Sequence, residues 1–267
     1  MSVAASENTV LTERRGAVFV IAINRPEARN AVDTPTAERL AEAFAAFEAD
    51  GEARVAVFHG ANGAFCAGAD LKKVSQSEMR MRELSEPPAR LDPNAPMGPS
   101  YMQTSKPVIG AIAGHAVAGG LELALLCDMR IAEESAVFGV YCRRWGVPLV
   151  DGGTIRLPRI VGMGNAMDMI LTGRPVHADE ALRMGLANRV VADGEGLDTA
   201  RALAHSIAGF PQRCLRADRL SAYRQWDQPL ADALAREGAG GYPIVFEEAI
   251  AGAERFTKGA GRHGEFE

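Results

Sequence analysis

Glu122 is the acidic residue of this sequence whose surroundings most favour chemistry. It follows the pair Gly119 and Gly120 in a helix expected over 121–127, which comes after an apolar strand expected over 107–113. Two glycines let backbone approach a ligand closely, and the unpaired N–H groups of a helix start carry the positive end of its dipole. A carbonyl oxygen that gains negative charge would be stabilised there. Glu122 is therefore either a carboxylate that this dipole stabilises or a catalytic one.

A second loop rich in small residues lies upstream, at 61–72. Small side chains around Ala69 would leave its backbone N–H accessible, and Asp70 is placed to cap a helix that begins at Leu71. The loop is either a place where backbone approaches a ligand or a tight strand-to-helix turn without one.

Composition indicates an ordinary globular protein. Of 267 residues, 47% are hydrophobic and 24% are charged, which argues against disorder or a fibrous fold. The formal net charge of −5 argues against a nucleic-acid binder. The four cysteines are scattered and form no CxxC pair, so we expect neither a disulfide framework nor a metal site. With neither a leader pattern nor a long apolar run, we expect a cytoplasmic protein that does not span a membrane.

The elements that must position these loops alternate between strands and helices, which predicts an α/β fold. The expected strands lie at 18–23, 55–59, 107–113, 129–132 and 136–140. A helix that begins at Asp33 is expected between the first two of them. From residue 165 the pattern is helical, at 166–171, 178–184, 197–207, 212–223 and 229–256. We expect a core over 1–195 that holds both loops, a helical region over 196–267, and a partly ordered loop over a pocket at 74–100.

The two loops together resemble a known pair. The segments GAFCAGADLKK at 63–73 and GHAVAGGLELALLCD at 114–128, in which Gly119 follows Ala69 by 50 residues, resemble the two oxyanion-hole segments of the crotonase (enoyl-CoA hydratase/isomerase) superfamily. The similarity begins with INRPEARNA at 23–31 and continues through Phe138-Gly139, Gly152-Gly153-Thr154, Leu171-Thr172-Gly173 and Phe256-Thr257-Lys258. It spans most of the chain.

The resemblance implies a spiral of repeated ββα units with C-terminal helices that build homotrimers or dimers of trimers. The ligand would be an acyl-CoA thioester, with no cofactor beyond the coenzyme A of the substrate. The thioester oxygen would accept hydrogen bonds from the backbone N–H groups of Ala69 and Gly119. The residues implied to contact substrate or coenzyme A are Arg29, Ala67, Asp70, Leu71, Lys72 and Cys142. The charges of Arg29 and Lys72 could instead be solvated at the surface.

One position departs from the hydratases of this family, in which two glutamates hold and activate water. Glu122 matches the first, but Cys142 stands at the second, and an ordinary thiol pKa of about 8.5 does not suit proton transfer at neutral pH. Asp151 is the nearest alternative carboxylate, and it is either catalytic or the cap of a helix at Gly153. A further hypothesis makes Cys142 a nucleophile whose pKa is lowered by the arginines that follow it.

The expected function is therefore that of an enoyl-CoA hydratase or isomerase that stabilises a thioester enolate, with Glu122 and Asp151 as catalytic residues. Because Cys142 replaces the second glutamate, a double-bond isomerase, a thioester hydrolase or a decarboxylase stays open as an alternative. An alternative of another class is a catalytically silent acyl-CoA-binding protein.

Overall fold

The computed structural model describes residues 8–75 and 95–261, and the chain divides into two compact units, Met1–Ala208 and Gly209–Glu267. The expected boundary between the core and the helical region lay at residue 195. The structure instead keeps helix α6 (Gly196–Gly209) with the first unit, because Ala200, Ala204 and Ala208 of α6 pack in a core cluster with the valines of the central strands.

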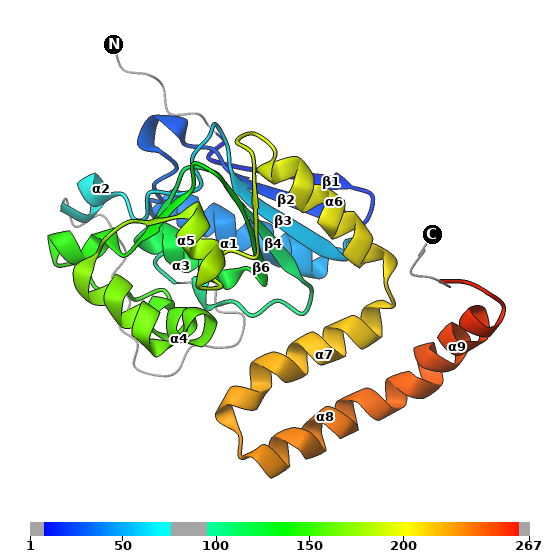
Figure 1. The fold of residues 1–267 in the computed structure, drawn as a ribbon. Coiled ribbons are helices and arrows are strands. Elements are labelled where there is room, and N and C mark those ends of the chain that lie inside the picture. The colour runs from blue at the N-terminus through cyan, green and yellow to red at the C-terminus, as the bar shows by residue number, and fades with distance from the viewer. Residues whose placement is uncertain (1–7, 76–94, 262–267) are drawn as a thin grey trace. The chain divides into compact units, whose positions relative to one another are not determined.

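A six-stranded sheet forms the centre of the first unit (Figure 1). Its order is β1-β2-β3-β4-β6-β9; β1 pairs with β2 in antiparallel fashion, and the other neighbours are parallel. The strands are β1 (Val10–Arg15), β2 (Val18–Ile23), β3 (Val55–Gly60), β4 (Val108–Ile112), β6 (Met129–Glu133) and β9 (Arg189–Val191). β1, with five exposed residues of six, and β9 are the two edge strands, and the buried apolar runs are inner strands.

Alternation along each inner strand divides the apolar residues between the two faces of the sheet. In β2, Phe19 and Ile21 pack in the larger core cluster with helix α1 (Thr34–Ala49), whereas Val18 and Val20 pack in the cluster that contains α6. The α1 helix begins where it was expected, because the side chain of Asp33 accepts a hydrogen bond from the Thr36 N–H at 3.1 Å.

A second sheet of three strands, in the order β5-β7-β8, completes the spiral. Its strands are β5 (His115–Val117), β7 (Val137–Gly139) and β8 (Val176–His177). Along the chain, β4 and β5 precede helix α3 (Gly119–Leu126), and β6 and β7 precede helix α4 (Gly153–Thr172), so each turn gives one strand to each sheet and then a helix. The α/β spiral of ββα units is thus confirmed. Residues 115–117, which lie in none of the strands expected from the sequence, form β5 because β7 supplies a hydrogen-bonding partner.

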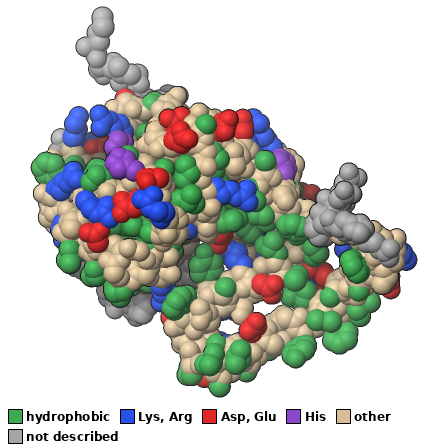
Figure 2. Space-filling model, in the orientation of Figure 1, with side chains coloured by type: hydrophobic (Ala, Val, Ile, Leu, Met, Phe, Trp, Pro, Cys, Tyr) green, Lys and Arg blue, Asp and Glu red, His purple; other side chains and the backbone are tan. Residues whose placement is uncertain are grey.

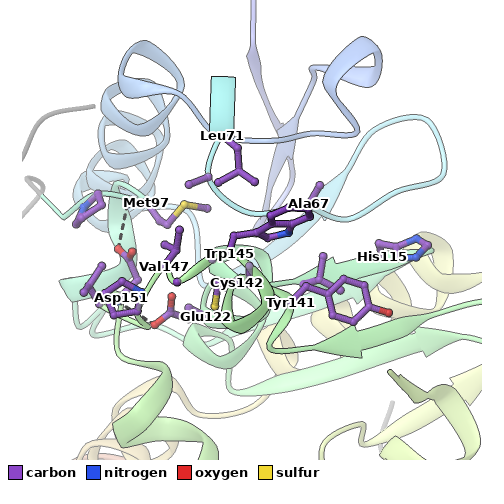
Figure 3. Close-up of a pocket in the computed structure, with 18 of the residues that line it drawn as sticks. Ala67, Leu71, Met97, His115, Glu122, Tyr141, Cys142, Trp145, Val147 and Asp151 are labelled. Atoms are coloured by element: carbon purple, nitrogen blue, oxygen red, sulfur yellow. Dashed lines mark hydrogen bonds between the residues drawn. The ribbon is translucent and has the colours of Figure 1, made fainter. Parts of the chain in front are cut away.

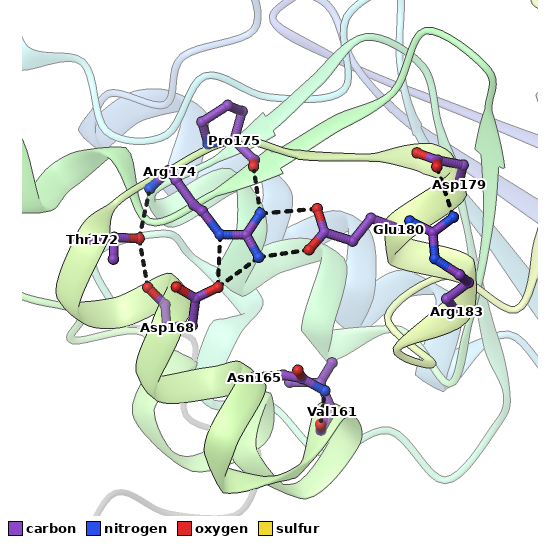
Figure 4. A network of polar contacts seen from close by, with 9 residues as sticks. All are labelled: Val161, Asn165, Asp168, Thr172, Arg174, Pro175, Asp179, Glu180 and Arg183. Carbon is purple, nitrogen blue, oxygen red and sulfur yellow. Dashed lines mark hydrogen bonds and ion pairs between the residues drawn. The ribbon is translucent and has the colours of Figure 1, made fainter.

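Helix α4 is longer than the sequence pattern indicated, since it starts at Gly153 rather than near residue 166. Pro158 and the positive φ of 77° at Gly162 interrupt its periodicity. Its end is joined to helix α5 (Ala178–Arg183) by Arg174, which binds Asp168 at 2.6 Å and Glu180 at 2.6 Å (Figure 4). These ion pairs link the end of α4 to α5.

The second unit is helical, as expected. It contains α7 (Gln212–Arg224), α8 (Leu230–Ile244), a π-helical turn (Val245–Ala249) and α9 (Ile250–Thr257). Large apolar side chains lie exposed on it (Figure 2), among them Leu230, Tyr242, Phe246 and Phe256. Among the described residues, no helix combines the length and the apolar character that a membrane crossing requires.

Candidate active site

The two small-residue loops lie side by side. The Cys66 N–H donates to the His115 carbonyl at 2.9 Å, and the Val117 N–H donates to the Cys66 carbonyl at 3.1 Å, so the first loop extends the edge of β5. The approach leaves no room for a side chain, because a Cβ at Gly120 would lie 2.1 Å from the Cys66 carbonyl oxygen. A Cβ at Gly68 would lie 3.1 Å from the backbone nitrogen of Gly119. The glycines are therefore required by the close approach of the two backbones.

The backbone N–H groups of Ala69 and Gly119 border one cavity of about 650 Å³. Gly119 is the first residue of α3, so its N–H has no partner within the helix. Val32 bonds to the carbonyl of Gly68 and to the N–H of Asp70, each at 2.8 Å, and this parallel bridge directs the N–H of Ala69 away from Val32. Ala69 and Gly119 thus line the same cavity, as the predicted oxyanion hole requires.

Ala118 has a backbone conformation that alanine rarely adopts, with φ 53° and ψ −125°. Its N–H donates to the Gly139 carbonyl at 2.9 Å, and its carbonyl accepts from the Glu122 N–H at 3.2 Å. These bonds hold the turn that begins α3 and orient the peptide of Gly119. Sequence reasoning did not single out Ala118, because a positive φ at a non-glycine residue depends on its tertiary contacts.

Asn30 is a second residue that the sequence reasoning missed. Its side chain is fully buried, and its Nδ2 donates to the carbonyls of Ala61 at 2.9 Å and Ala64 at 2.6 Å. Its Oδ1 accepts from the Arg25 N–H at 2.8 Å. Asn30 therefore fixes the loop that leads to Ala69, and the only signal in the sequence was its place in the segment 23–31.

The predicted contact residues divide into two groups. Arg29, Ala67, Leu71 and Cys142 line the cavity, whereas Asp70 and Lys72 are absent from its lining in the described chain. Asp70 instead caps the short helix α2 (Leu71–Ser75) by accepting from the Lys72 N–H at 3.2 Å, and it binds Arg25 at 3.2 Å. The side chain of Lys72 is exposed. Of the loop expected over 74–100, residues 76–94 lie outside the described residues.

Glu122 is a buried carboxyl group in the cavity wall, with 2% of its surface exposed. Its Oε1 accepts from the backbone N–H of Asp151 at 2.9 Å and of Gly153 at 2.7 Å. Burial, and secondarily the nearby Asp151, raises the pKa of Glu122 to about 7, although these two hydrogen bonds oppose the shift. A carboxyl group with such a pKa can both accept and donate a proton near neutral pH.

Asp151 lies beside Glu122 in the cavity wall (Figure 3) and is only 3% exposed. Its Oδ1 accepts from the Met97 N–H at 3.0 Å and from the hydroxyl of Ser100. Burial raises its pKa, against the effect of these two bonds. The alternative interpretation of Asp151 as the cap of the helix at Gly153 is wrong, because the Gly153 N–H donates to Glu122.

Cys142 lies in the 3-10 helix Tyr141–Trp145 and is 7% exposed. Burial, and then the charge of Glu122, raises the pKa of its thiol. Arg143 donates to the Ile170 carbonyl at 3.2 Å and Arg144 donates to the Gly173 carbonyl at 2.9 Å, so both bind the end of α4. The expectation that the arginines lower the pKa of the Cys142 thiol is therefore wrong, because burial and Glu122 outweigh the opposing effect of Arg143.

The remainder of the cavity is mostly apolar, and its walls include Leu71, Met97, Trp145, Val147, Pro148 and Val150. Trp145 is 70% exposed, so it stands at the mouth with most of its indole in water. Figure 3 shows Glu122 and Asp151 on one side of the cavity, and Tyr141 and His115 on the other. Within residues 8–75 and 95–261, no group of three or more His, Cys, Asp or Glu residues could hold a metal ion.

Comparisons with known proteins agree with this geometry. The model of the family described as enoyl-CoA hydratase/isomerase matches residues 13–243. A probable enoyl-CoA hydratase of Rhizobium meliloti is 38% identical over 232 residues, which are 87% of this chain and 88% of the relative. A carnitinyl-CoA dehydratase of Salmonella paratyphi A is 34% identical over 95% of this chain and 96% of its own. The crystal structure of enoyl-CoA hydratase EchA1 from Mycobacterium marinum superposes with a TM-score of 0.85 at 32% identity, over 94% of this chain and 96% of that one.

Proposed function

Because the chain belongs to the enoyl-CoA hydratase/isomerase family, we propose that it adds water reversibly to a 2-enoyl-CoA thioester with Glu122 as its acid/base group. The chain is an enzyme of the enoyl-CoA hydratase/isomerase type. The observation that carries the proposal is the placement of Glu122, which faces a cavity bordered by two backbone N–H donors and has a pKa of about 7.

The thioester oxygen accepts hydrogen bonds from Ala69 and Gly119 in this mechanism. Both are backbone donors held by the rigid pairing of two loops, so they need no reorganisation as negative charge develops. A donor of this kind contributes about 3 kcal/mol to stabilisation of an oxyanion. The electron pair of the carbon–carbon double bond moves toward the thioester as the enolate forms.

Glu122 acts in both half-reactions. Its Oε2 accepts a proton from water as the water oxygen bonds to the β carbon, and it then returns a proton to the α carbon of the enolate. Oε1 stays bonded to Asp151 and Gly153, so the carboxylate keeps its orientation during the exchange. A second acid/base residue typically contributes about 10²- to 10⁴-fold, so we expect a slower hydration than two carboxylates would give.

Double-bond isomerisation is the second candidate, and Asp151 is the observation that favours it. Isomerisation moves a proton between two carbons and adds no water, and Asp151 shares the cavity with Glu122. Burial keeps the pKa of Asp151 above its ordinary value, which suits a proton carrier.

Substrate contacts and assembly are further parts of the proposal. Arg29, Ala67, Leu71 and Cys142 line the cavity, and we assign them to the acyl-CoA; Lys72, exposed next to Leu71, is assigned to the coenzyme A phosphates. Exposed apolar side chains on the second unit support a homotrimer or a dimer of trimers, which light scattering after gel filtration tests. A cytoplasmic location and the need for no cofactor beyond the coenzyme A of the substrate stay predictions.

The experiment that tests the function uses crotonyl-CoA and longer 2-enoyl-CoA thioesters, with loss of the conjugated thioester absorbance as the signal. We expect turnover by the native enzyme and a loss of about 10²-fold or more in Glu122→Gln, with acyl-CoA binding retained. Absence of turnover on all 2-enoyl substrates, with binding intact, contradicts hydration. Turnover of a 3-enoyl-CoA in that case supports isomerisation.

A further inference from the structure

We propose that Asp151 is a positioning residue that ties Glu122 to the segment 95–101, of which Pro96, Met97 and Tyr101 line the cavity. Its backbone N–H holds the acid/base group, and its carboxylate holds the wall against which the acyl group packs. The inference rests on the proposed function. It assigns to Asp151 a role different from the proton transfer that the sequence suggested.

Asp151 is bonded in two directions. Its backbone N–H donates to Oε1 of Glu122 at 2.9 Å, whereas its carboxylate Oδ1 accepts from the Met97 N–H at 3.0 Å (Figure 3) and from the hydroxyl of Ser100. Ser100 is fully buried and Asp151 is 3% exposed. Hydrogen bonds of buried groups that water cannot replace are the ones whose loss is most unfavourable.

Arg156, in helix α4, strengthens the contact between Asp151 and the segment 95–101. Its Nη1 donates to the carbonyl of Asp151 at 3.1 Å, and its Nη2 donates to the carbonyl of Ser100 at 2.7 Å. The hydroxyl of Tyr101 also donates to the carbonyl of Val150. The segment 95–101 is therefore held to residues 150–151 by side-chain bonds from both partners.

Met97 connects the contact between Asp151 and the segment 95–101 to the assigned oxyanion donor Gly119. Its side chain is 1% exposed, lines the cavity and packs on the start of α3, where a Cβ at Gly119 would lie 2.7 Å from Sδ of Met97. Release of the Met97 N–H would leave a buried donor without its acceptor and move a wall that touches the residue assigned as oxyanion donor. Glu122 would keep its bonds from the backbone N–H groups of residues 151 and 153, so the acid/base group would persist while its surroundings loosen.

Asparagine at residue 151 separates positioning from proton transfer. Its Oδ1 can accept from Met97 and Ser100 as the aspartate does, but its amide cannot carry a proton to substrate. Alanine removes the acceptor altogether. A positioning role predicts that Asp151→Asn is tolerated and Asp151→Ala is not, whereas a proton-transfer role predicts that both lose activity.

The test measures kcat and KM on a 2-enoyl-CoA for both variants. We expect Asp151→Asn to keep kcat within about threefold, and Asp151→Ala to raise KM by about tenfold or more with a smaller fall in kcat. A fall of about 10²-fold or more in kcat of Asp151→Asn with an unchanged KM overturns the proposal, because a group that transfers a proton contributes that much.

A measurement that needs no turnover distinguishes failure of this inference from failure of the proposed function. Hydrogen exchange of the Met97 amide should be at least about tenfold faster in Asp151→Ala than in the native enzyme, and close to native in Asp151→Asn. Equal protection in all three proteins overturns the proposal even if no substrate is found. If Asp151→Ala does not fold, Ser100→Ala replaces it, because it removes one of the two donors to Oδ1; faster exchange of Met97 is expected, and native exchange contradicts the inference.

Discussion

The carboxylate of Glu122 accepts a hydrogen bond from the backbone N–H of Gly153 at 2.7 Å, so a residue of one helix caps the start of another. Glu122 lies in α3 and Gly153 opens α4, and the cap satisfies one of the N–H groups that a helix start leaves without a partner. The same contact orients the carboxyl group within the cavity. The same bond therefore helps to orient the acid/base group and to satisfy the start of α4.

Gly153→Ala is expected to damage activity because of this contact. A Cβ at residue 153 would lie 2.8 Å from Oε1 of Glu122, so the carboxylate must shift. We expect kcat/KM to fall by about tenfold or more, since misplacement of a reacting group by about 1 Å can lower the rate by about 10²-fold. Gly164→Ala, in the same helix, is the matched control, because a Cβ there meets nothing within 4 Å. Equal activities of the two variants would contradict the role of the contact.

Glu122 should make stability depend on pH. Its pKa is raised from 4.5 to about 7 in the folded enzyme, so folding favours the protonated form; the stabilisation is complete below 4.5 and is lost as the pH rises through 7. In Glu122→Gln the side chain is neutral at every pH, so the variant does not lose this stabilisation as the pH rises through 7. We expect the variant's advantage in free energy of unfolding to be about 2 to 3 kcal/mol larger at about pH 8 than at about pH 5, by urea denaturation. An advantage that is independent of pH would exclude the raised pKa.

Asn30→Ala should destabilise the enzyme and lower its activity together. The substitution leaves the partly buried carbonyls of Ala61 and Ala64 without the Nδ2 donor, and an unsatisfied buried group is unfavourable by about 1 to 3 kcal/mol. We expect the free energy of unfolding to fall by about 2 to 4 kcal/mol. Asn30→Asp is the matched variant, because it keeps the acceptor for the Arg25 N–H but lacks the two donors. If Asn30→Asp were as stable as the native enzyme, the Nδ2 bonds would not hold the loop.

Cys142 should be dispensable for chemistry. Burial and the charge of Glu122 raise the pKa of its thiol, which disfavours the nucleophilic thiolate form. We expect Cys142→Ala to keep kcat within about threefold. Iodoacetamide should inactivate the Cys214→Ala enzyme, which lacks the exposed thiol, only slowly. Rapid inactivation that the acyl-CoA prevents would show a reactive Cys142 instead.

Trp145 should report occupancy of the cavity. The chain has two tryptophans, and Trp145 lines the cavity mouth with 70% of its surface exposed, so an acyl-CoA would cover it. We expect its fluorescence to change on binding in Trp226→Phe, which leaves Trp145 as the single tryptophan. The signal should be lost in Trp145→Phe. An unchanged emission of Trp145 at saturating acyl-CoA would place the ligand elsewhere.

The strands and helices around the site could be predicted because their signals are local. The apolar run at 18–23, the Asp33 cap and the helical run from residue 197 each depend on neighbours in sequence, and β2, α1 and α6 lie where these signals put them. The strand β5 and the first half of α4 could not be predicted in this way. β5 needs the hydrogen bonds of β7, and the start of α4 needs the carboxylate of Glu122.

The same distinction between local signals and long-range contacts applies to the candidate site. The residue types and spacing of the small-residue loops and of Glu122 indicated a place where backbone N–H groups reach a carbonyl oxygen that gains charge. Their resemblance to the crotonase superfamily then implied an acyl-CoA enzyme of the hydratase/isomerase type. The bonding of Asp151, the raised pKa of the Cys142 thiol and the burial of Asn30 arise from contacts between segments far apart in the chain. Desolvation and long-range hydrogen bonds set them, and neither is encoded in the spacing of neighbouring residues.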